Sequence, residues 1–461
     1  MRIRYMPAAA ALVVGVASPA FSQSGFPSDS AIRSIVEQRV AWNRAVGLIV
    51  AIAEPGSPPR VFTAGKSGGD SVALGINSVV EIGSITKAFT GILFADMVRR
   101  GEVRMEDPVA RYLPPDVKVP ARGGRQITLL DLVTHTSGLP RMPDNFRPAN
   151  PANPYADYTA RQMYDFLSGH TLARDIGEKY EYSNLGMGLL GHALARRAGK
   201  SYEDLIVERV LRPLGMNDTR ITLTPAMQKR LVPGHTQDGA RAANWDLPTF
   251  AGAGALRSTA QDMLAFLAAN LDSMKTPLHR AMAESHRSRT SAGPTMSVGL
   301  AWHVRQAPGN TIVWHNGGTG GYRTFAGFDP GSGRRVVVFS NSGWSADDIG
   351  FHLLNRELPL MQQPKERRQQ VAVSSSVLAS YIGVYELAPE FRIAITQQND
   401  TLFAQATQQP RFPVFAESDT AFFFKVVDAQ LTFQRDSSGR TKQLILHQNG
   451  RQMPGRRIES P

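Results

Sequence analysis

The sequence predicts an α/β fold: an antiparallel sheet flanked by helices, with a helical subdomain beside it, followed by a small all-β domain. Two apolar runs near the start of the chain, Gly47–Ala53 and Arg60–Gly65, have the composition of strands. Four more strand-like runs lie between residues 300 and 340, and helical patterns fill the segment between the two groups. One sheet built from both ends of a domain and covered by its middle explains this order. Beyond residue 380 the chain changes to short alternating runs, which indicate β structure.

The first 22 residues have the pattern of a secretory signal peptide. Arg2 and Arg4 precede the apolar run Ala8–Ala17, and Ala20-Phe21-Ser22 resembles a cleavage site. The apolar run is too short to cross a bilayer, no cysteine follows it that could carry a lipid, and no second run has the length of a membrane span. The sequence therefore predicts a signal peptide at 1–22 and an exported, soluble, periplasmic protein.

The rest of the chain is predicted to form two domains. Its 461 residues exceed a single typical core, and the polar, basic segment Leu360–Gln370 has the composition of a linker. We predict a catalytic domain at 23–360, a linker at 361–372 and a small β-meander or half-barrel at 373–461. The strand-like runs behind the last prediction are Phe391–Thr396, Thr401–Gln405, Ala421–Val426, Gln430–Arg435 and Leu444–Gln448. They include no evident catalytic grouping, which suits a packing or dimerisation module.

Residue counts exclude several functional classes. The chain has no cysteine, which excludes disulfides, thiolate metal sites and a cysteine nucleophile. Its ten histidines show no close metal-binding spacing, so the sequence predicts neither a metal nor a cofactor. Without the signal peptide, 49 basic residues stand against 39 acidic ones, a net charge of +10 that is scattered along the chain. Nucleic acid is not the expected partner of an exported protein; an anionic envelope surface or an acidic wall polymer fits the charge better as a field effect, and a solvated basic surface is the favoured interpretation. The oligomeric state stays open.

The segment Glu81–Gly101 predicts a buried helix that carries a reactive pair. Most residues from Ile85 to Val98 are apolar, and a helix that is apolar on almost all sides is a buried one. Glycine and serine suit its start, and two arginines followed by glycine suit its end. Lys87 is the exception, because it places a cation in the first turn of a buried helix. Its spacing puts it on the same face as Ser84.

Burial of Lys87 beside Ser84 predicts an activated nucleophile. Desolvation lowers the pKa of a buried ammonium group, which lets the amine act as a base toward a neighbouring hydroxyl. The N-terminus of the helix also favours negative charge on a serine oxygen. Taken alone, the Ser-x-x-Lys pattern fits a simpler structure equally well, in which Ser84 caps the helix and Lys87 extends its head to water.

Caps and periodicity predict the other elements of the catalytic domain. Thr128 suits the start of a short helix at Ile127–Val133. The proline- and asparagine-rich segment Pro140–Tyr158 is predicted to be a long loop, either a flap over a site or a surface excursion. The remaining helices are expected after Asn184 as far as Ala198, over Ser201–Leu211 and over Ser258–Leu271. The late strands are expected at Leu300–Val304, Thr311–His315, Arg323–Phe328 and Arg335–Ser340.

A second grouping, Tyr182-Ser183-Asn184, supplies a phenol and an amide just before a helix. A phenol acts as a base only where nearby cations stabilise its phenolate, and Lys87 could be that cation. Asn184 can both donate and accept, so it could hold Lys87 and a substrate amide together. Without other motifs, a buried tyrosine beside a capping asparagine would be the favoured interpretation.

A third grouping, His315-Asn316-Gly317-Gly318, stands at the end of a predicted strand. Glycines at a strand edge let a substrate backbone approach closely. They also leave backbone N–H groups free, and those of Ser84 and Gly318 would together form an oxyanion hole. A glycine-rich hairpin with a surface histidine is the alternative interpretation.

Together the three groupings resemble a known family. Ser84-x-x-Lys87, Tyr182-x-Asn184 and His315-x-Gly317 follow the order and rough spacing of the motifs in serine β-lactamases and penicillin-binding DD-peptidases. The Tyr-x-Asn form is similar to that of the class C β-lactamase branch and its low-molecular-weight DD-peptidase relatives. The similarity covers roughly Ala31 to Pro359, and the C-terminal part resembles the small β-barrel modules appended to some members.

The resemblance implies a β-lactamase/DD-peptidase fold and a role for each motif residue. Ser84 would be the acyl-enzyme nucleophile, Lys87 and Tyr182 would share proton transfer, and Asn184 would position the amide of the substrate. His315, Asn316 and Gly317 would bind substrate. The activity implied is hydrolysis of β-lactams or D-alanyl peptides.

Position 315 departs from the family pattern, which usually has lysine there followed by threonine or serine. A histidine with an unperturbed pKa near ~6.5 is only partly charged at neutral pH, and Asn316 replaces a hydroxyl with an amide. Both changes weaken the expected binding of a substrate carboxylate. An esterase or D-aminopeptidase is therefore an alternative, and a non-catalytic penicillin sensor with a lipocalin-like tail is another.

Overall fold

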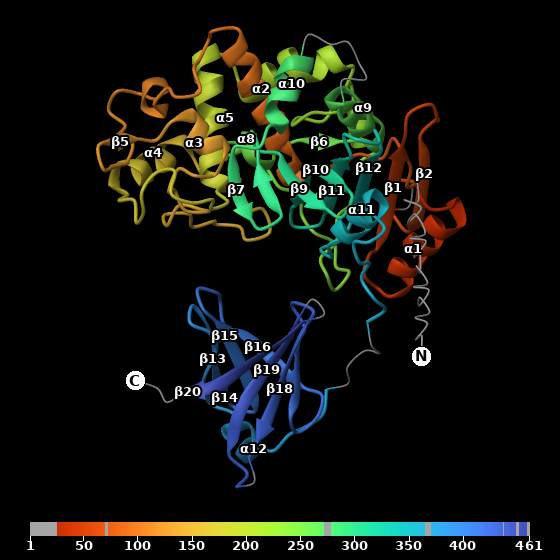
Figure 1. Cartoon of the computed structure of the whole chain (residues 1–461), viewed down its shortest axis with the longest axis vertical. Helices are drawn as coiled ribbons and strands as arrows, with labels where there is room; N and C mark the ends of the chain where they lie inside the picture. The colour runs from red at the N-terminus through yellow and green to blue at the C-terminus, as the bar shows by residue number, and fades with distance from the viewer. Residues whose placement is uncertain are drawn as a thin grey trace, which may run out of the picture. The chain divides into compact units, whose positions relative to one another are not determined.

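The computed structural model describes residues 25–69, 72–271, 278–364, 370–436, 438–448 and 451–458 (Figure 1). The signal peptide predicted at 1–22 lies outside these residues. The chain divides into two compact units, Met1–Met361 and Gln362–Pro461, and each has its own hydrophobic core. Within the described ranges, no helix has both the length and the apolar character needed to cross a membrane.

The first unit is built on an eight-stranded antiparallel sheet. Across the sheet the strands are β2 (Arg60–Gly65), β1 (Gly47–Ala53), β12 (Arg335–Ser340), β11 (Arg323–Phe328), β10 (Asn310–Gly318), β9 (His303–Ala307), β8 (Met296–Val298) and β7 (Thr290–Gly293). The early strand β1 pairs with the late strand β12, so that Leu48 lies opposite Ser340. This confirms the prediction of one antiparallel sheet assembled from both ends of the domain.

Strand β1 is buried on both faces of the sheet, which agrees with its uninterrupted apolar sequence. Its alternate residues Leu48, Val50 and Ile52 pack into a core shared with helices α1 (Asp29–Ala41) and α11 (Asp347–Leu354). The residues between them face the larger core on the other side, which holds helices α2 (Thr86–Arg99) and α9 (Ala260–Asn270). The sheet is therefore covered by helices on both faces, as predicted.

Helix α2 confirms the predicted buried helix. Every residue from Thr86 to Met97 is buried, and burial of each large apolar side chain contributes about 1.5–3 kcal/mol to stability. A 3-10 turn, Gly83–Ile85, leads into the helix. Just beyond its end, Gly101 has a φ of 71°, a left-handed conformation that favours glycine. Lys87 lies in the first turn and is fully buried.

A group of helices set away from the sheet forms the predicted helical subdomain (Figure 1). Its members α3 (Leu129–Val133), α4 (Ala160–Gly169) and α5 (Asn184–Ala198) each begin after a threonine or serine whose side chain accepts a backbone N–H. The other helices of the first unit are α6 (Tyr202–Ile206), α7 (Pro225–Gln228), α8 (Ala251–Gly254) and α10 (His279–His286). Two short antiparallel pairs complete the unit, β3 (Val80–Glu81) with β6 (Arg257–Ser258) and β4 (Ala121–Arg122) with β5 (Arg125–Gln126).

Several predicted boundaries in the first unit are shifted, including those of β10, which extends to Gly318, and of α3, which begins at Leu129. The strand expected at Leu300–Val304 begins at His303, because Ala301 has a φ of 68° and the chain turns there. The helix expected over Ser258–Leu271 begins at Ala260, because Thr259 is its N-cap and the preceding pair of residues forms β6. The helix expected over Ser201–Leu211 is α6 followed by a π-helical turn.

The second unit is a closed eight-stranded barrel rather than the predicted meander or half-barrel. Its elements are α12 (Ser375–Ala379), β13 (Gly383–Ala388), β14 (Phe391–Gln398), β15 (Thr401–Ala406), β16 (Phe412–Ala416), β17 (Ala421–Phe424), β18 (Ala429–Arg435), β19 (Thr441–Gln448) and β20 (Arg451–Ile458). Strand β20 pairs with β13 and so closes the barrel. Aliphatic and aromatic side chains fill its core, where the rings of Tyr381 and Phe433 stack with centroids 4.1 Å apart.

Candidate active site

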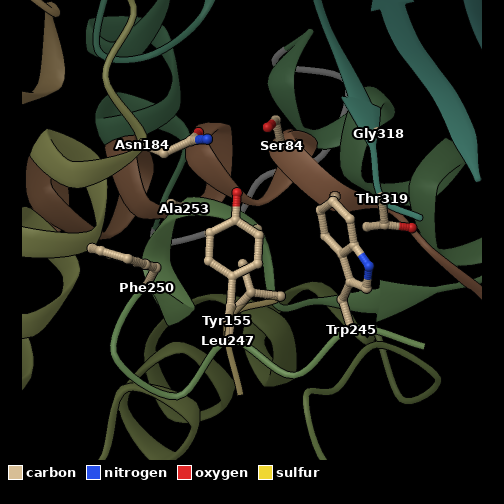
Figure 2. A pocket seen from close by; sticks show the side chains of 11 residues that line it. Ser84, Tyr155, Asn184, Trp245, Leu247, Phe250, Ala253, Gly318 and Thr319 are labelled. Atoms are coloured by element: carbon tan, nitrogen blue, oxygen red, sulfur yellow. The ribbon is translucent and has the colours of Figure 1, made fainter. Parts of the chain in front are cut away.

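The three sequence motifs meet around one small pocket in the first unit (Figure 2). Ser84 comes from the turn before α2, Asn184 is the first residue of α5, and Gly318 is the last residue of β10. The pocket is lined by Gly83, Ser84, Tyr155, Asn184, Trp245, Leu247, Phe250, Ala253, Gly254, Gly318 and Thr319. Elements far apart in the sequence thus bring a serine hydroxyl, an amide and a strand edge together.

Close backbone contacts hold the Ser84 turn against the end of β10. Gly83 has a φ of 52°, and a Cβ there would lie 2.8 Å from the backbone nitrogen of Gly318. A Cβ on Gly317 would lie 1.9 Å from the carbonyl oxygen of Ile82. Only glycine allows this approach at both positions. The exposed Gly318 consequently lies beside the turn that carries Ser84.

Lys87 makes three polar contacts from a fully buried position. Its Nζ lies 3.0 Å from Ser84 Oγ, 2.9 Å from Asn184 Oδ1 and 2.6 Å from the carbonyl oxygen of Ala253. Burial lowers the pKa of Lys87 well below its ordinary value of 10.5, and the positive charge of Arg141 lowers it further. The amine is therefore available in its neutral form, as the sequence predicts.

Tyr182 lies against both members of this pair. Lys87 Nζ lies 4.9 Å from the centroid of its ring, and the Ser84 side chain is close enough to act on the pKa of its hydroxyl. Desolvation raises the pKa of Tyr182 to about 12, against the opposing effects of Ser84 and of Arg141. Tyr182 is therefore a protonated phenol in the free protein, which differs from the cation-stabilised phenolate considered from the sequence. The reason is that burial of the phenol outweighs the groups that favour its ionised form.

Asn184 connects the pair to a neighbouring loop. Its side chain accepts from Lys87 and forms a hydrogen bond with Tyr155, while its backbone nitrogen donates to the carbonyl of Arg141 at 3.0 Å. The adjacent Ser183 donates from Oγ to the carbonyl of Pro140 at 2.6 Å. The start of α5 thereby fixes the first residues of the loop predicted at Pro140–Tyr158. Because Tyr155 lines the pocket, this loop covers the site rather than extending over a remote surface.

His315 is fully buried and neutral. Its Nδ1 lies 2.6 Å from the carbonyl oxygen of Asn316, so Nδ1 carries the proton and donates it there. Nε2 is then an acceptor, and it has no hydrogen-bond partner among the described residues. Burial, followed by the neighbouring His303 and Lys87, lowers the pKa of His315 well below its ordinary value. The structure therefore contains neither the partly charged histidine nor the surface histidine considered from the sequence.

The structure places Asn316 on the opposite face of β10 from His315, as alternation along a strand requires. Its Nδ2 donates to a carboxylate oxygen of Asp347 in α11 at 2.5 Å. Gly317 faces the same side as His315, beneath the Ser84 turn. Ser84, Lys87, Tyr182, Asn184, Gly317 and Gly318 therefore gather at the site, whereas the Asn316 side chain is directed away from it.

Four residues of the site were not predicted from the sequence. Arg141 and Tyr155 come from the loop over the pocket, and Trp245 and Phe250 come from the segment before α8. Figure 2 shows Tyr155 and Trp245 beside each other near Ser84, and their ring centroids are 5.3 Å apart. The only signal was the density of prolines in the loop, which indicated a flap without indicating which side chains point inward.

A buried carboxylate supports the Trp245 segment. Glu81 Oε1 accepts from the backbone nitrogen of Trp245 at 2.9 Å and from Asn244 at 3.0 Å, and it pairs with Arg257 at 3.2 Å. These bonds link the strand before the Ser84 turn to the aromatic wall of the pocket. Among the described residues, no group of histidine and carboxylate side chains could hold a metal ion.

Each of the two units matches a known protein family. The family described as "Beta-lactamase" matches residues 32–352, which is more than half of the chain. A second family, described as "Domain of unknown function (DUF3471)", matches residues 367–457 and so corresponds to the barrel.

Curated and solved proteins give the same assignment. D-alanyl-D-alanine-carboxypeptidase/endopeptidase AmpH of Escherichia coli is 32% identical over 277 residues, which are 57% of this chain and 70% of that protein. Penicillin-binding protein 4* of Bacillus subtilis is 26% identical over 404 residues, covering 81% of this chain and 86% of that protein.

The solved structures agree in fold. A β-lactamase/D-alanine carboxypeptidase from Yersinia pestis, in complex with citrate, has a TM-score of 0.60 at 27% identity and covers 72% of this chain and 99% of its own. A class C β-lactamase from Rhodobacter sphaeroides has a TM-score of 0.62 at 23% identity, covering 72% of this chain and 100% of its own. The chain belongs to the β-lactamase family and is a serine hydrolase of the β-lactamase and D-Ala-D-Ala carboxypeptidase type.

Proposed function

We propose that this chain is an exported hydrolase that forms an acyl-enzyme through Ser84 and hydrolyses β-lactams or D-alanyl peptides. The observation that carries the proposal is the contact of Ser84 Oγ with the buried amine of Lys87, at 3.0 Å. The relatives named as a D-alanyl-D-alanine-carboxypeptidase and as β-lactamases support this substrate class. The signal-like sequence of residues 1–22 supports export to the periplasm.

Acylation begins with proton transfer from Ser84 to Lys87. A neutral amine has two N–H donors and one lone pair. Asn184 Oδ1 and the Ala253 carbonyl take the two donors, at 2.9 and 2.6 Å, so the lone pair is directed to the Ser84 hydroxyl. Ser84 Oγ loses its proton to Lys87 as it bonds to the substrate carbonyl carbon, and the carbonyl oxygen becomes an oxyanion.

The oxyanion and the leaving group each need a donor. The backbone N–H groups of Ser84 and Gly318 would donate to the oxyanion. Tyr182, a protonated phenol beside Ser84, would give its proton to the leaving nitrogen or oxygen as the acyl bond breaks. Lys87, now an ammonium, returns the proton to Tyr182, which leaves the amine neutral for the attack of water on the acyl-enzyme. Asn184 would position the amide of the acyl group.

Two observations favour an esterase or D-aminopeptidase as the second candidate. His315 is neutral, so it lacks the cation expected for a substrate carboxylate, and the wall beside Ser84 is aromatic, with Tyr155, Trp245 and Phe250. Such a wall suits an apolar acyl group. A non-catalytic sensor is less well supported, because Lys87, Tyr182 and Asn184, the residues proposed to carry turnover, are all present, and the interior of the barrel is filled by its own side chains.

The proposal is tested by mixing the protein without residues 1–22 with a penicillin and following both drug loss and intact protein mass. We expect drug loss, with at most a transient mass increase that maps to Ser84. A lasting adduct on Ser84 with surviving drug would assign a DD-peptidase or a sensor instead. If neither change occurs and short acyl esters are hydrolysed, the esterase or aminopeptidase is the correct assignment.

The variant Ser84→Ala serves as the matched control. We expect it to lose all turnover and all adduct formation while its thermal unfolding stays within a few degrees of the parent, because Ser84 is only half-buried. Residual turnover in Ser84→Ala at more than a small fraction of the parent rate would contradict the acyl-enzyme mechanism.

A further inference from the structure

The groups predicted to hold a substrate carboxylate do not present a positive charge to it. His315 is buried and neutral, and the Asn316 amide already donates to the carboxylate of Asp347. Lys87 is also fully buried, and its amine makes three polar contacts inside the protein. A carboxylate on the substrate therefore needs a different cation at the mouth of the site.

Arg141 is an exposed cation held beside the reacting groups. Its guanidinium carbon lies 5.0 Å from the centroid of the Tyr182 ring, a distance at which a guanidinium and an aromatic face attract each other. Its charge acts on Lys87, His135, Tyr155 and Tyr182 at once. Arg141 thus influences the pKa values of several titratable groups at the site.

Backbone hydrogen bonds fix the main chain of Arg141 and therefore the position from which its side chain extends. The carbonyl oxygen of Arg141 accepts from the backbone nitrogens of Asn184 and Leu185, at 3.0 and 3.2 Å. Its neighbour Pro140 accepts from Ser183 Oγ at 2.6 Å. Among the described residues, no carboxylate forms an ion pair with the Arg141 guanidinium, and no acceptor takes its N–H groups. Five donors in a planar fork are therefore available to a ligand.

We infer that Arg141 is the specificity-determining residue that binds the carboxylate on the leaving-group side of the substrate, a role that rests on the proposed acyl-enzyme function. The guanidinium lies against Tyr182, the residue proposed to protonate the leaving group. A carboxylate paired with Arg141 would therefore place the leaving atom close to the Tyr182 hydroxyl. The charge is permanent, unlike that of a histidine, so binding would persist across the neutral pH range.

Another arginine near the end of β10 is less suited to this role. Arg323 lies against Gly318 on the face of the sheet that carries Asn316. Its guanidinium already donates to the carbonyls of Thr319 and Tyr322, at 2.7 and 2.8 Å, and it lies in the field of Asp347. Arg323 is thus engaged in holding the strand end.

The test uses two phenylacetylglycyl esters that differ only in the charge of the leaving group, one with a meta-carboxyphenyl and one with a meta-carbamoylphenyl group. The measured quantity is the ratio of their kcat/KM values. This ratio cancels any effect of Arg141 on the pKa of Lys87, because that effect acts on both esters alike. The variants are Arg141→Gln and Arg141→Lys, and Arg147→Gln is the matched control, since Arg147 is exposed on the same loop and donates only to backbone carbonyls of that loop.

We expect the parent protein to prefer the carboxylate ester and Arg141→Gln to lose that preference by roughly tenfold, as expected for one hydrogen-bonded charge pair. Arg141→Lys should keep part of it, and Arg147→Gln all of it. Added salt should reduce the preference in the parent but not in Arg141→Gln.

An equal fall for both esters in Arg141→Gln would overturn the inference, as would a parent that hydrolyses both esters through Ser84 without preference. The proposed function would survive either result. Absence of any Ser84-dependent turnover of both esters would overturn the proposed function together with the inference.

Discussion

The buried amine of Lys87 makes the reaction depend on pH in a predictable direction. Only the neutral amine can take the proton of Ser84, and burial lowers the pKa of Lys87 well below 10.5. The acylation rate constant should therefore rise with pH through this lowered pKa and be constant above it. Single-turnover kinetics with a neutral ester would measure the profile. An acylation rate that first rises only near pH 10.5 would contradict a neutral, buried lysine.

The same experiment on Arg141→Gln supplies an internal control. Removing a like charge makes protonation of Lys87 easier, so the midpoint of the profile should move to higher pH. Lys87→Arg carries a permanent charge, so its acylation rate constant should show no rise with pH. If the midpoint stayed fixed in Arg141→Gln, the rise of the acylation rate constant with pH would report the titration of another group.

At the scale of elements, the active site depends on how closely the Ser84 turn approaches β10. Gly83→Ala introduces a Cβ 2.8 Å from Gly318 N and a side chain at a φ of 52°. We expect acylation to slow at least tenfold, because the two N–H groups of the proposed oxyanion hole are pushed apart; removal of a single such donor slows reactions of this kind by about 100-fold or more.

Gly101→Ala is the matched control for this variant. Gly101 also has a positive φ, 71°, but a Cβ there meets nothing within 4 Å. Both variants should therefore share the backbone strain, about 1–2 kcal/mol, which thermal unfolding would measure. Only Gly83→Ala should lose activity, and equal activity losses in the two variants would show that strain rather than the close contact matters.

Elements also show what the sequence could predict about this protein. Helix α2 and strand β1 were predictable because their residues are apolar over their whole length, which forces burial. Strands β16 and β20 were not, because Pro413 and Pro454 remove ladder donors and argue against a strand; pairing within the barrel outweighs this. Without β20 the strand pattern alone indicated a meander or half-barrel, whereas the family resemblance indicated the barrel that the structure contains.

The same distinction holds for the site. Ser84 and Lys87 were predictable because three residues along a helix fix which side chains meet. Arg141, Tyr155 and Trp245 reach the pocket from loops whose path is set by hydrogen bonds to distant residues, such as Pro140 to Ser183 and Trp245 to Glu81. No local pattern encodes those bonds. The neutral state of His315 depends in the same way on burial among residues far away in the chain.

At the scale of the whole molecule, all the residues that line the pocket belong to the first unit. We expect a chain ending at Met361 to fold, to unfold in a single transition by calorimetry, and to be acylated by a penicillin at the rate of the complete protein. The complete protein should show two transitions, one of which matches the shortened chain. A shortened chain that folds but is not acylated would show that the barrel contributes to the site.

The pairing of β1 with β12 determines when during its synthesis the chain can become active. Leu48 finds its partner only when Ser340 has been made, so the sheet cannot be completed on a partly synthesised chain. Such long-range pairing makes folding slow, because a large loop must close first. Until then the apolar β1 segment has an unpaired edge open to other chains. In a nascent chain the proposed nucleophile and its base are therefore present before the sheet that positions them, and we expect hydrolytic activity only once β12 has been made.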